Sequence, residues 1–447
     1  STGTENSIFG NAAGDAVSTG SDNTFVGDSA GGAVSTASGH TAVGSSALLT
    51  MSTGTTGTAV GFEALKVATG NNNSAVGYQA GVAVSTGTEN TIVGNTAGDA
   101  VTTGADNTFV GDNAGGAVTT ASGHTAVGSS ALLTMSTGTT GTAVGFEALK
   151  VATGNNNSAV GYQAGVAVST GTENTIVGNA AGDAVTTGAD NTFVGDNAGG
   201  AVSTASGHTA VGSSALLTMS TGTTGTAVGF EALKVATGNN NSAMGYQAGV
   251  AVSTGTENTI VGNAAGDAVT TGADNTFIGD NAGGAVSTAS GHTAVGSSAL
   301  LTMSTGTTGT AVGFEALKVA TGNNNTAVGY QSGVAVSTGT ENTLVGNAAG
   351  DAVTTGADNT FVGDNAGGAT TTASNNVAVG SSALLVNSTG ASNTAVGAYA
   401  LDANTTAADN TAVGYASLGA NTTGAANTAV GSLALDASTT ASHNTAL

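Results

Sequence analysis

The histidines are the residues of this chain best suited to acid–base or metal chemistry. Four of them recur at a constant interval, where neighbouring segments carry asparagine: His40, His124, His208 and His292. If the intervening segments stack as β structure, successive histidines lie about 24 Å apart. That separation is too large for two of them to share one metal ion. We therefore interpret these histidines as members of a structural ladder rather than as metal ligands or bases.

Acidic side chains suggest a second kind of chemistry. The chain consists of long sequence blocks, each of the first four with one of these histidines. In the second block, four of the acidic residues are Glu89, Asp99, Asp106 and Asp112. Glu89 and Asp106 are equivalent in successive coils, so stacking would place them about 5 Å from one another. Like charges that close repel unless solvent or a cation relieves them. Because carboxylate oxygens suit Ca²⁺, the four acids are a candidate calcium site. Solvated turn acids are the alternative, since the glycine-rich nonapeptide of calcium β-rolls is missing. No other cofactor is expected.

Lysine and aromatic residues recur with the same interval. Each lysine follows Glu-Ala-Leu, as Lys150 follows Glu147, and this spacing favours a local ion pair. Phe146 and Tyr162 each follow the glycine that ends a predicted strand. They could contact carbohydrate or protein at the surface, or pack on neighbouring coils.

The composition limits the partners of the chain. Its 447 residues carry 4 basic and 27 acidic side chains, a net charge of −23. Nucleic acid is nearly excluded, because neutralising phosphates requires Lys and Arg. Anionic membrane surfaces are disfavoured, and no apolar run of about 18 residues predicts membrane insertion. The absence of cysteine is compatible with an extracellular location without disulfides.

A short repeated motif organises the whole chain. One copy of the motif is Asn90-Thr91-Ile92-Val93-Gly94. Similar motifs follow it, and their closing glycines are Gly111, Gly128, Gly145 and Gly161. The set of five motifs then starts again with the motif that ends at Gly178. Residues 1–363 form near-identical long blocks of this kind, and residues 364–447 continue them in a diverged form. Such a period is typical of a repeat architecture. Each unit reads as strand, turn, short strand and turn, so we expect an all-β, parallel β-solenoid with coils of about 17 residues.

Stacked coils would place equivalent residues in columns. The first column is a polar ladder that contains Asn90, Asn107 and His124. Two adjacent apolar columns follow, one with Ile92, Phe109 and Ala126 and the other with Val93, Val110 and Val127. Neighbouring strand residues point to opposite faces, so one column should be inside and the other outside. The uniform valine column suits a thin interior. We therefore predict that Ile92, Phe109 and Ala126 form a homo-oligomer interface; burial of both columns in one bent coil is the alternative.

The recurring motif resembles known surface proteins. Residues 73–80 read Asn-Ser-Ala-Val-Gly-Tyr-Gln-Ala, which resembles the head repeats of YadA-like trimeric adhesins and, more closely, repeats of bacteriophage tail-fibre proteins. The resemblance implies a left-handed β-roll, a trimer, and attachment to an unidentified surface receptor or glycan at a cell surface or on a virion. The adhesin repeat is shorter than the coil of this chain, and no part of residues 1–447 resembles the stalk or the membrane anchor of those proteins.

Three functional classes follow from this pattern. The first is a non-enzymatic, structural or adhesive fibre segment in an extracellular filament or tail-fibre shaft. The second is an ice-binding solenoid that uses the column formed by Thr91, Thr108, Thr125 and Thr142, although the paired Thr-x-Thr pattern is missing. The third is an enzyme on a β-helix, such as a polysaccharide lyase, but identical repeats offer no unique groove of acids and bases. We expect the first.

Overall fold

The computed structural model describes residues 2–52, 54–135, 138–139, 141–219, 222, 225–303 and 309–447. Ser1, the first residue of the predicted repeat region, lies outside these ranges. Among the described residues there are strands and turns and no helix, which confirms the prediction of an all-β parallel solenoid. The chain divides into two compact units, Ser1–Thr224 and Gly225–Leu447.

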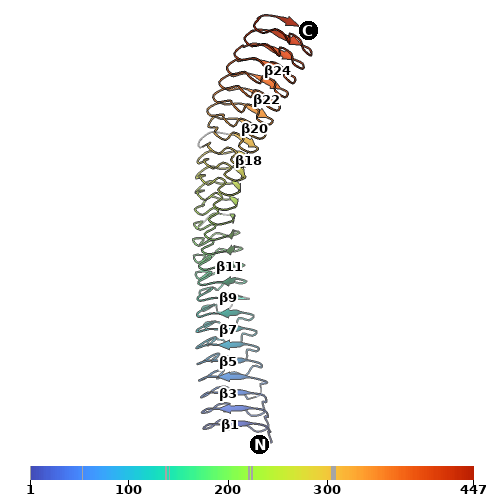
Figure 1. The fold of residues 1–447 in the computed structure, drawn as a ribbon. Coiled ribbons are helices and arrows are strands. Elements are labelled where there is room, and N and C mark those ends of the chain that lie inside the picture. Colours follow the sequence, from blue (N-terminus) through green and yellow to red (C-terminus); the bar gives the residue numbers. More distant parts are fainter. Residues whose placement is uncertain are drawn as a thin grey trace. The chain divides into compact units, whose positions relative to one another are not determined.

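The first unit holds strands β1 to β13, each of three residues (Figure 1). Their bounds are Ser7–Phe9, Thr24–Val26, Thr41–Val43, Thr58–Val60, Ser74–Val76, Thr91–Val93, Thr108–Val110, Thr125–Val127, Thr142–Val144, Ser158–Val160, Thr175–Val177, Thr192–Val194 and Thr209–Val211. Strands that follow one another along the sequence pair in parallel, so each coil contributes one strand.

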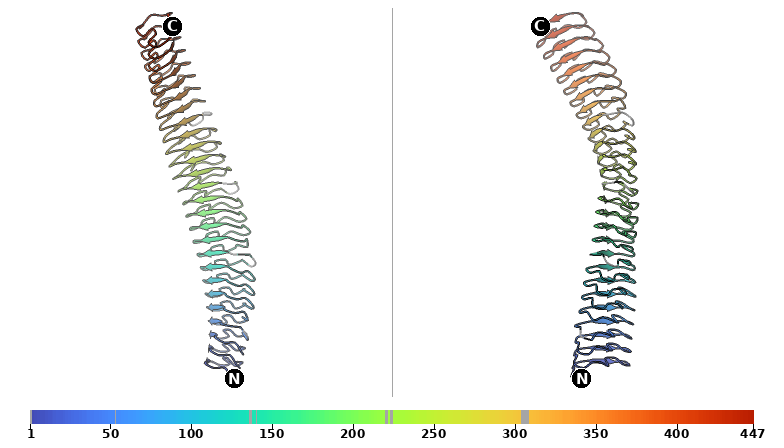
Figure 2. Two further views of the ribbon diagram at one scale, coloured as in Figure 1. Left: turned by 90° about the vertical axis from the view of Figure 1, so that its right-hand side faces the viewer. Right: turned by 180° about the vertical axis from the view of Figure 1, so that it is seen from behind.

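The second unit holds strands β14 to β27 in the same arrangement (Figure 2). Their bounds are Thr226–Val228, Ser242–Met244, Thr259–Val261, Thr276–Ile278, Thr293–Val295, Thr310–Val312, Thr326–Val328, Thr343–Val345, Thr360–Val362, Val377–Val379, Thr394–Val396, Thr411–Val413, Thr428–Val430 and Thr445–Ala446. Strands β22 and β23 pair on either side of residue 363. The change of sequence at residue 363 is therefore not a structural boundary.

The register of the strands places equivalent residues of successive coils beside one another. Between β6 and β7, Ile92 lies opposite Phe109 and Val93 opposite Val110. The backbone N–H of Thr91 donates to the carbonyl oxygen of Asn107 at 2.8 Å. Because successive coils repeat this pairing, such a short strand is stabilised by its neighbours on both sides rather than by its own length.

The structure reverses the predicted orientation of the two apolar columns. Ile92, Phe109 and Ala126 are fully buried inside the coils. Val93 is 37% exposed, and Val110 and Val127 are half-buried on the outside. The prediction that Ile92, Phe109 and Ala126 face another chain is therefore wrong, as is the prediction that Val93, Val110 and Val127 fill the interior.

The interior tolerates side chains of different size because a second position in the same coil compensates. Phe109 faces Gly115, where an added Cβ atom would lie 2.7 Å from the ring. In the next coil the small Ala126 is accompanied by Leu132, which is also fully buried. A large strand residue is thus matched by glycine and a small one by leucine, so the volume of the core stays nearly constant.

A close backbone contact explains the glycine that ends each strand. Gly111 has a φ of +140°, and a Cβ atom added there would lie 2.6 Å from the carbonyl carbon of Gly128 in the next coil. Backbone atoms cannot move aside as a side chain can, so the position requires glycine for both conformation and space. No helix long and apolar enough to span a membrane occurs in the described part of the chain.

Candidate functional site

The predicted asparagine ladder runs through the interior of the coils. Nδ2 of Asn107 donates to Oδ1 of Asn90 at 3.0 Å and to the carbonyl oxygen of Ala121 at 3.0 Å. The backbone N–H of His124 then donates to Oδ1 of Asn107 at 2.9 Å. All three ladder residues are fully buried, and their polar groups bind one another and the backbone. The ladder therefore satisfies buried polar groups along the stack.

The histidines are part of this ladder. Nδ1 of His124 accepts the backbone N–H of Gly141 at 2.7 Å, and Nε2 lies 3.1 Å from the carbonyl oxygen of Gly138. A carbonyl oxygen only accepts, so the proton is on Nε2 and the ring is neutral. Burial lowers the pKa of His124, against smaller opposing effects of these backbone hydrogen bonds. Both ring nitrogens are thus used for structure.

A second buried ladder was missed by the sequence analysis. In the diverged coils the interior position of valine is taken by Asn387, Asn404 and Asn421, which are fully buried. Nδ2 of Asn404 donates to Oδ1 of Asn387 at 3.0 Å, and Nδ2 of Asn421 donates to Oδ1 of Asn404 at 3.1 Å. The regular recurrence of these asparagines, once in each coil, was the available signal.

The four candidate calcium ligands do not form one site. No group of three or more His, Cys, Asp or Glu side chains that could hold a metal occurs within the described ranges, which include all four acids. Glu89 and Asp106 share one column, but Asp99 and Asp112 belong to two other positions of the coil. Oδ1 of Asp112 accepts Nδ2 of Asn95 at 2.8 Å. Partial burial raises the pKa of Asp99.

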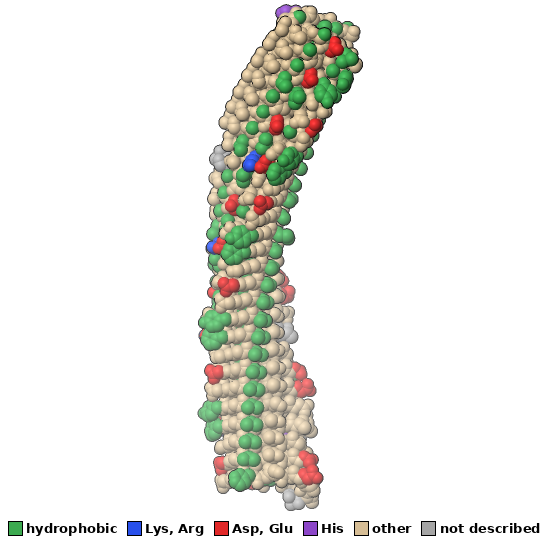
Figure 3. Space-filling model, in the orientation of Figure 1, with side chains coloured by type: hydrophobic (Ala, Val, Ile, Leu, Met, Phe, Trp, Pro, Cys, Tyr) green, Lys and Arg blue, Asp and Glu red, His purple; other side chains and the backbone are tan. Residues whose placement is uncertain are grey.

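The first and third residues of each strand form an exposed surface, which we call the outer strand face. Its side chains are threonine or serine in one column, with Val377 as an exception in β23, and mostly valine in the other. None of the described strands contains a charged residue. Val76, Val93 and Val160 are 42%, 37% and 43% exposed. Figure 3 shows hydrophobic side chains in a continuous row along the region of the first unit. Such a row on a parallel sheet is unusual, because both faces of parallel sheets are normally covered.

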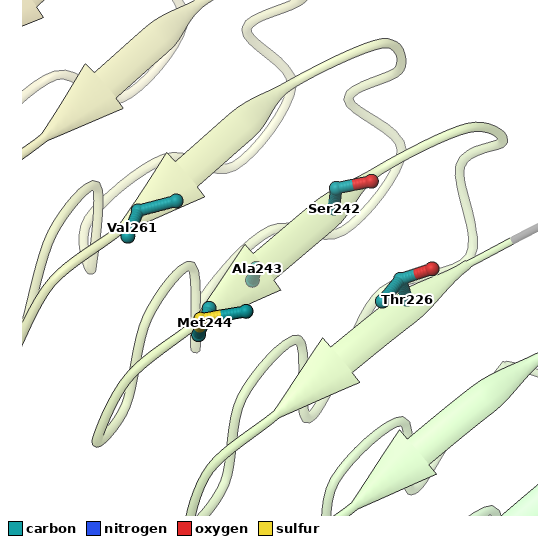
Figure 4. Close-up of a pocket in the computed structure, with 5 residues that line it drawn as sticks. All are labelled: Thr226, Ser242, Ala243, Met244 and Val261. Carbon is teal, nitrogen blue, oxygen red and sulfur yellow. The ribbon is translucent and has the colours of Figure 1, made fainter.

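One methionine alters this surface in the second unit. Met244 occupies a valine position of the column and is 53% exposed. It lines a shallow apolar hollow with Thr226, Ser242, Ala243 and Val261, which lie on three successive strands (Figure 4). Because its lining is almost entirely apolar and, apart from Ala243, belongs to the outer strand face, the hollow offers packing rather than polar recognition.

Aromatic residues form a second surface feature beside the strand ends. The rings of Phe146 and Tyr162 stack at a centroid distance of 5.3 Å with an interplanar angle of 13°, and they are 44% and 52% exposed. The two rings thus pack on one another across neighbouring coils, and each remains about half exposed to solvent.

Polar side chains frame this aromatic pair. Oε1 of Glu147 lies 2.6 Å from Nζ of Lys150, and its Oε2 accepts Nε2 of Gln163 at 2.8 Å. The hydrogen bond from Lys150, and then that from Gln163, lowers the pKa of Glu147, so the group is a carboxylate at neutral pH. We call Phe146, Tyr162, Glu147, Lys150 and Gln163 the aromatic ledge.

The fold and these surfaces define a repetitive parallel β-solenoid protein with polar ladders inside and an uncharged sheet face outside, over the part of the chain that the structure describes. No family model matches the sequence, and no curated protein is significantly similar to it.

Proposed function

We propose that this chain is a structural segment of an extracellular, non-enzymatic fibre in which sister chains cover the outer strand face. The observation that carries the proposal is the exposed valine column, with Val93 and Val177 each 37% exposed. Contiguous apolar surface of this kind is typical of interaction sites. The apolar column repeats from coil to coil, so it favours a partner whose surface repeats with the same spacing. Another copy of this chain has that spacing.

The distribution of charge supports the same partner. Copies with a net charge of −23 repel one another. The strands that the structure describes carry no charged residue, so the outer strand face is the surface along which two copies can approach with the least repulsion. The resemblance of the repeat to trimeric adhesins and tail fibres adds support for three chains, for attachment to a surface, and for a location at a cell surface or on a virion.

Solution mass tests this proposal directly. A single chain has a mass of 41.5 kDa, and we expect light scattering to give a multiple of it. A triple variant with Val93→Asp, Val177→Asp and Val261→Asp places charges on the outer strand face and should shift the mass toward one chain. The matched control adds the same charges at exposed positions outside the strands: Thr103→Asp, Thr187→Asp and Thr271→Asp. A wild-type mass of one chain would contradict the proposal.

An ice-binding role is a second candidate, because the outer strand face also carries a column of hydroxyl groups. Thr91 and Thr142 are exposed on the same side as the valines. Coils about 4.8 Å apart would repeat these groups as a regular array of hydroxyl and methyl groups. Thermal hysteresis of the single chain, lost when Thr91 and Thr142 become lysine, would favour this role. Absence of hysteresis in a multi-chain assembly would favour the fibre.

A further inference from the structure

The aromatic ledge recurs once in each of the first four long blocks. The ring pairs are Phe62–Tyr78, Phe146–Tyr162, Phe230–Tyr246 and Phe314–Tyr330, all with a centroid distance of 5.3 Å and interplanar angles of 12–13°. An equivalent Glu–Lys ion pair of 2.6–2.7 Å accompanies each ring pair. The exposure of the tyrosine rings is also constant, at 51–52%. The ledge is therefore one construction in four copies.

The solenoid does not need these rings for its core. The interior of this coil is filled by Ala148 and Leu149, which are fully buried, whereas Phe146 points outward and is 44% exposed. The same outward position in neighbouring coils holds Asn95, Asp112 and Ser129, so small polar residues fit the fold equally well. Exposing two large rings where polar residues suffice indicates a contact with something outside the chain.

The surroundings of the rings indicate the chemistry of that contact. Tyr162 covers one face of Phe146, and the coil on the other side carries the small Ser129 in the same column. Along the edge of the first unit in Figure 3, clusters of hydrophobic side chains alternate with acidic side chains. A free aromatic face with hydrogen-bonding groups around it suits a ligand that has an apolar face and a polar rim.

We propose that each aromatic ledge binds one segment of a neutral polysaccharide. A sugar ring presents C–H groups on its face and hydroxyl groups around its rim, so it can stack on the aromatic ring while its hydroxyls reach the polar frame. Glu147 is fixed by Lys150 and Gln163, and its carboxylate can accept further hydrogen bonds besides these two. The net charge of −23 disfavours anionic polysaccharides.

The repetition of the ledge favours a polymer over a free sugar. Equivalent ledges within one unit are separated by one long block, which spans about 24 Å in stacked β structure. Weak binding at one ledge becomes strong when one polymer reaches several ledges. This inference supplies a ligand for the proposed attachment role, and its biological meaning rests on that role. The binding itself can be tested separately, because the ledge and the outer strand face use different residues.

Tyrosine fluorescence gives a direct test on the full chain. The protein has no tryptophan and six tyrosines, four of which belong to the ledges. We would titrate it with cellohexaose, laminarihexaose, mannohexaose and maltohexaose, with the corresponding polymers, and with the acidic polymer alginate. Binding of at least one neutral hexasaccharide should change the emission, and its polymer should bind at least tenfold more tightly.

Variants assign the binding to the ledge. Replacing Tyr78, Tyr162, Tyr246 and Tyr330 by alanine should weaken binding by about tenfold or more, measured by isothermal titration calorimetry because this variant lacks the four reporting tyrosines. Gln163→Leu together with its three equivalents keeps all the rings and should weaken binding to a similar degree. The control is Tyr399→Ala with Tyr415→Ala, because these rings meet edge to face at 6.0 Å, in coils with neither glutamate nor lysine. Circular dichroism checks that each variant is folded.

The remaining outcomes overturn the inference. They are no binding of any neutral glycan, binding of alginate alone, and equal loss in the control variant. If the ledge variants instead reduce the mass of the assembly without affecting glycan binding, the rings belong to an interface between chains. A protein that is a single chain in solution and binds glycan would contradict the proposed fibre and support glycan binding at the ledge. A protein that assembles but binds no glycan would support the fibre and contradict glycan binding.

Discussion

The backbone N–H of Gly141 donates a 2.7 Å hydrogen bond to Nδ1 of the buried His124. The two residues occupy consecutive rungs of the asparagine ladder, and the imidazole takes the place of two amides. A Cβ atom at position 141 would lie 3.2 Å from Nδ1, so the glycine leaves room for the ring. Histidine and glycine are therefore one structural unit, which the sequence repeats once in each of the first four long blocks.

This unit makes stability depend on pH. Burial lowers the pKa of His124 in the folded chain, while the unfolded chain has the ordinary value of about 6.5. As the pH falls below about 6.5, the unfolded chain takes up protons first, so the free energy of unfolding decreases until the lower folded pKa is passed. We expect thermal denaturation temperatures to fall between pH 7.5 and pH 5.

An asparagine replacement provides the control for that measurement. The double substitution His124→Asn with Gly141→Asn restores the amide rungs used by neighbouring coils. Introduced in all four blocks, it should flatten the pH dependence between pH 5 and 7.5. An unchanged slope would mean that other groups, such as the aspartates, dominate the titration.

The strand-ending glycines should be intolerant of any side chain. Gly111→Ala would place a Cβ atom 2.6 Å from the backbone of Gly128, at a φ of +140°. We expect a loss of about 3 kcal/mol or more in the free energy of unfolding, measured by urea denaturation. Gly116→Ala is the matched control, because its closest contact would be the flexible end of Leu133, at 3.0 Å. A similar small effect of both substitutions would refute the close-contact explanation.

Phe109 and Gly115 should show strong energetic coupling. Phe109→Ala leaves a cavity and should cost about 3–5 kcal/mol. Gly115→Leu alone collides with the ring. Together they reproduce the combination of Ala126 and Leu132 in the next coil, and the double variant should recover more than half of the summed loss. A double-mutant cycle measures the coupling, and additive losses would show that the two positions do not share one volume.

Thr370 should be replaceable by valine with a gain in stability. It is fully buried, and within the described part of the chain its hydroxyl has no hydrogen-bond partner. The equivalent interior position in other blocks is valine, for example Val118. Thr370→Val should raise the free energy of unfolding by about 1 kcal/mol, since an unsatisfied buried hydroxyl is removed. Thr371→Val is the control and should not stabilise, because the hydroxyl of Thr371 donates to the carbonyl oxygen of Ser388 at 3.0 Å.

The solenoid was predictable from spacing alone, whereas the direction of its faces was not. The regular interval of the motif predicts which residues lie side by side, and the ladder through Asn90, Asn107 and His124 follows from it. It does not tell which of two adjacent apolar columns is inside. Uniformity was a misleading guide, because the interior varies and is compensated within the coil. The pairing of Phe109 with Gly115 later in the same coil carried that information.

The candidate sites were predictable to different degrees. The structural role of the histidines followed from their column. The four-acid calcium site does not form, because acids that are close in sequence, such as Asp99 and Asp112, take different positions around the coil. Phe146 and Tyr162 were visible as recurrent aromatics, but their stacking and the fixing of Glu147 by Gln163 depend on side-chain conformation, which spacing does not determine.

The near-identity of the long blocks makes the gene tolerant of recombination. Removal of residues 85–168 would join Val84 to Ser169, which occupies the place of Ser85. Each coil would then meet a neighbour of nearly the same kind as before, since contacts in a solenoid involve adjacent coils. Unequal crossing-over could therefore lengthen or shorten the protein by whole blocks without creating a new junction.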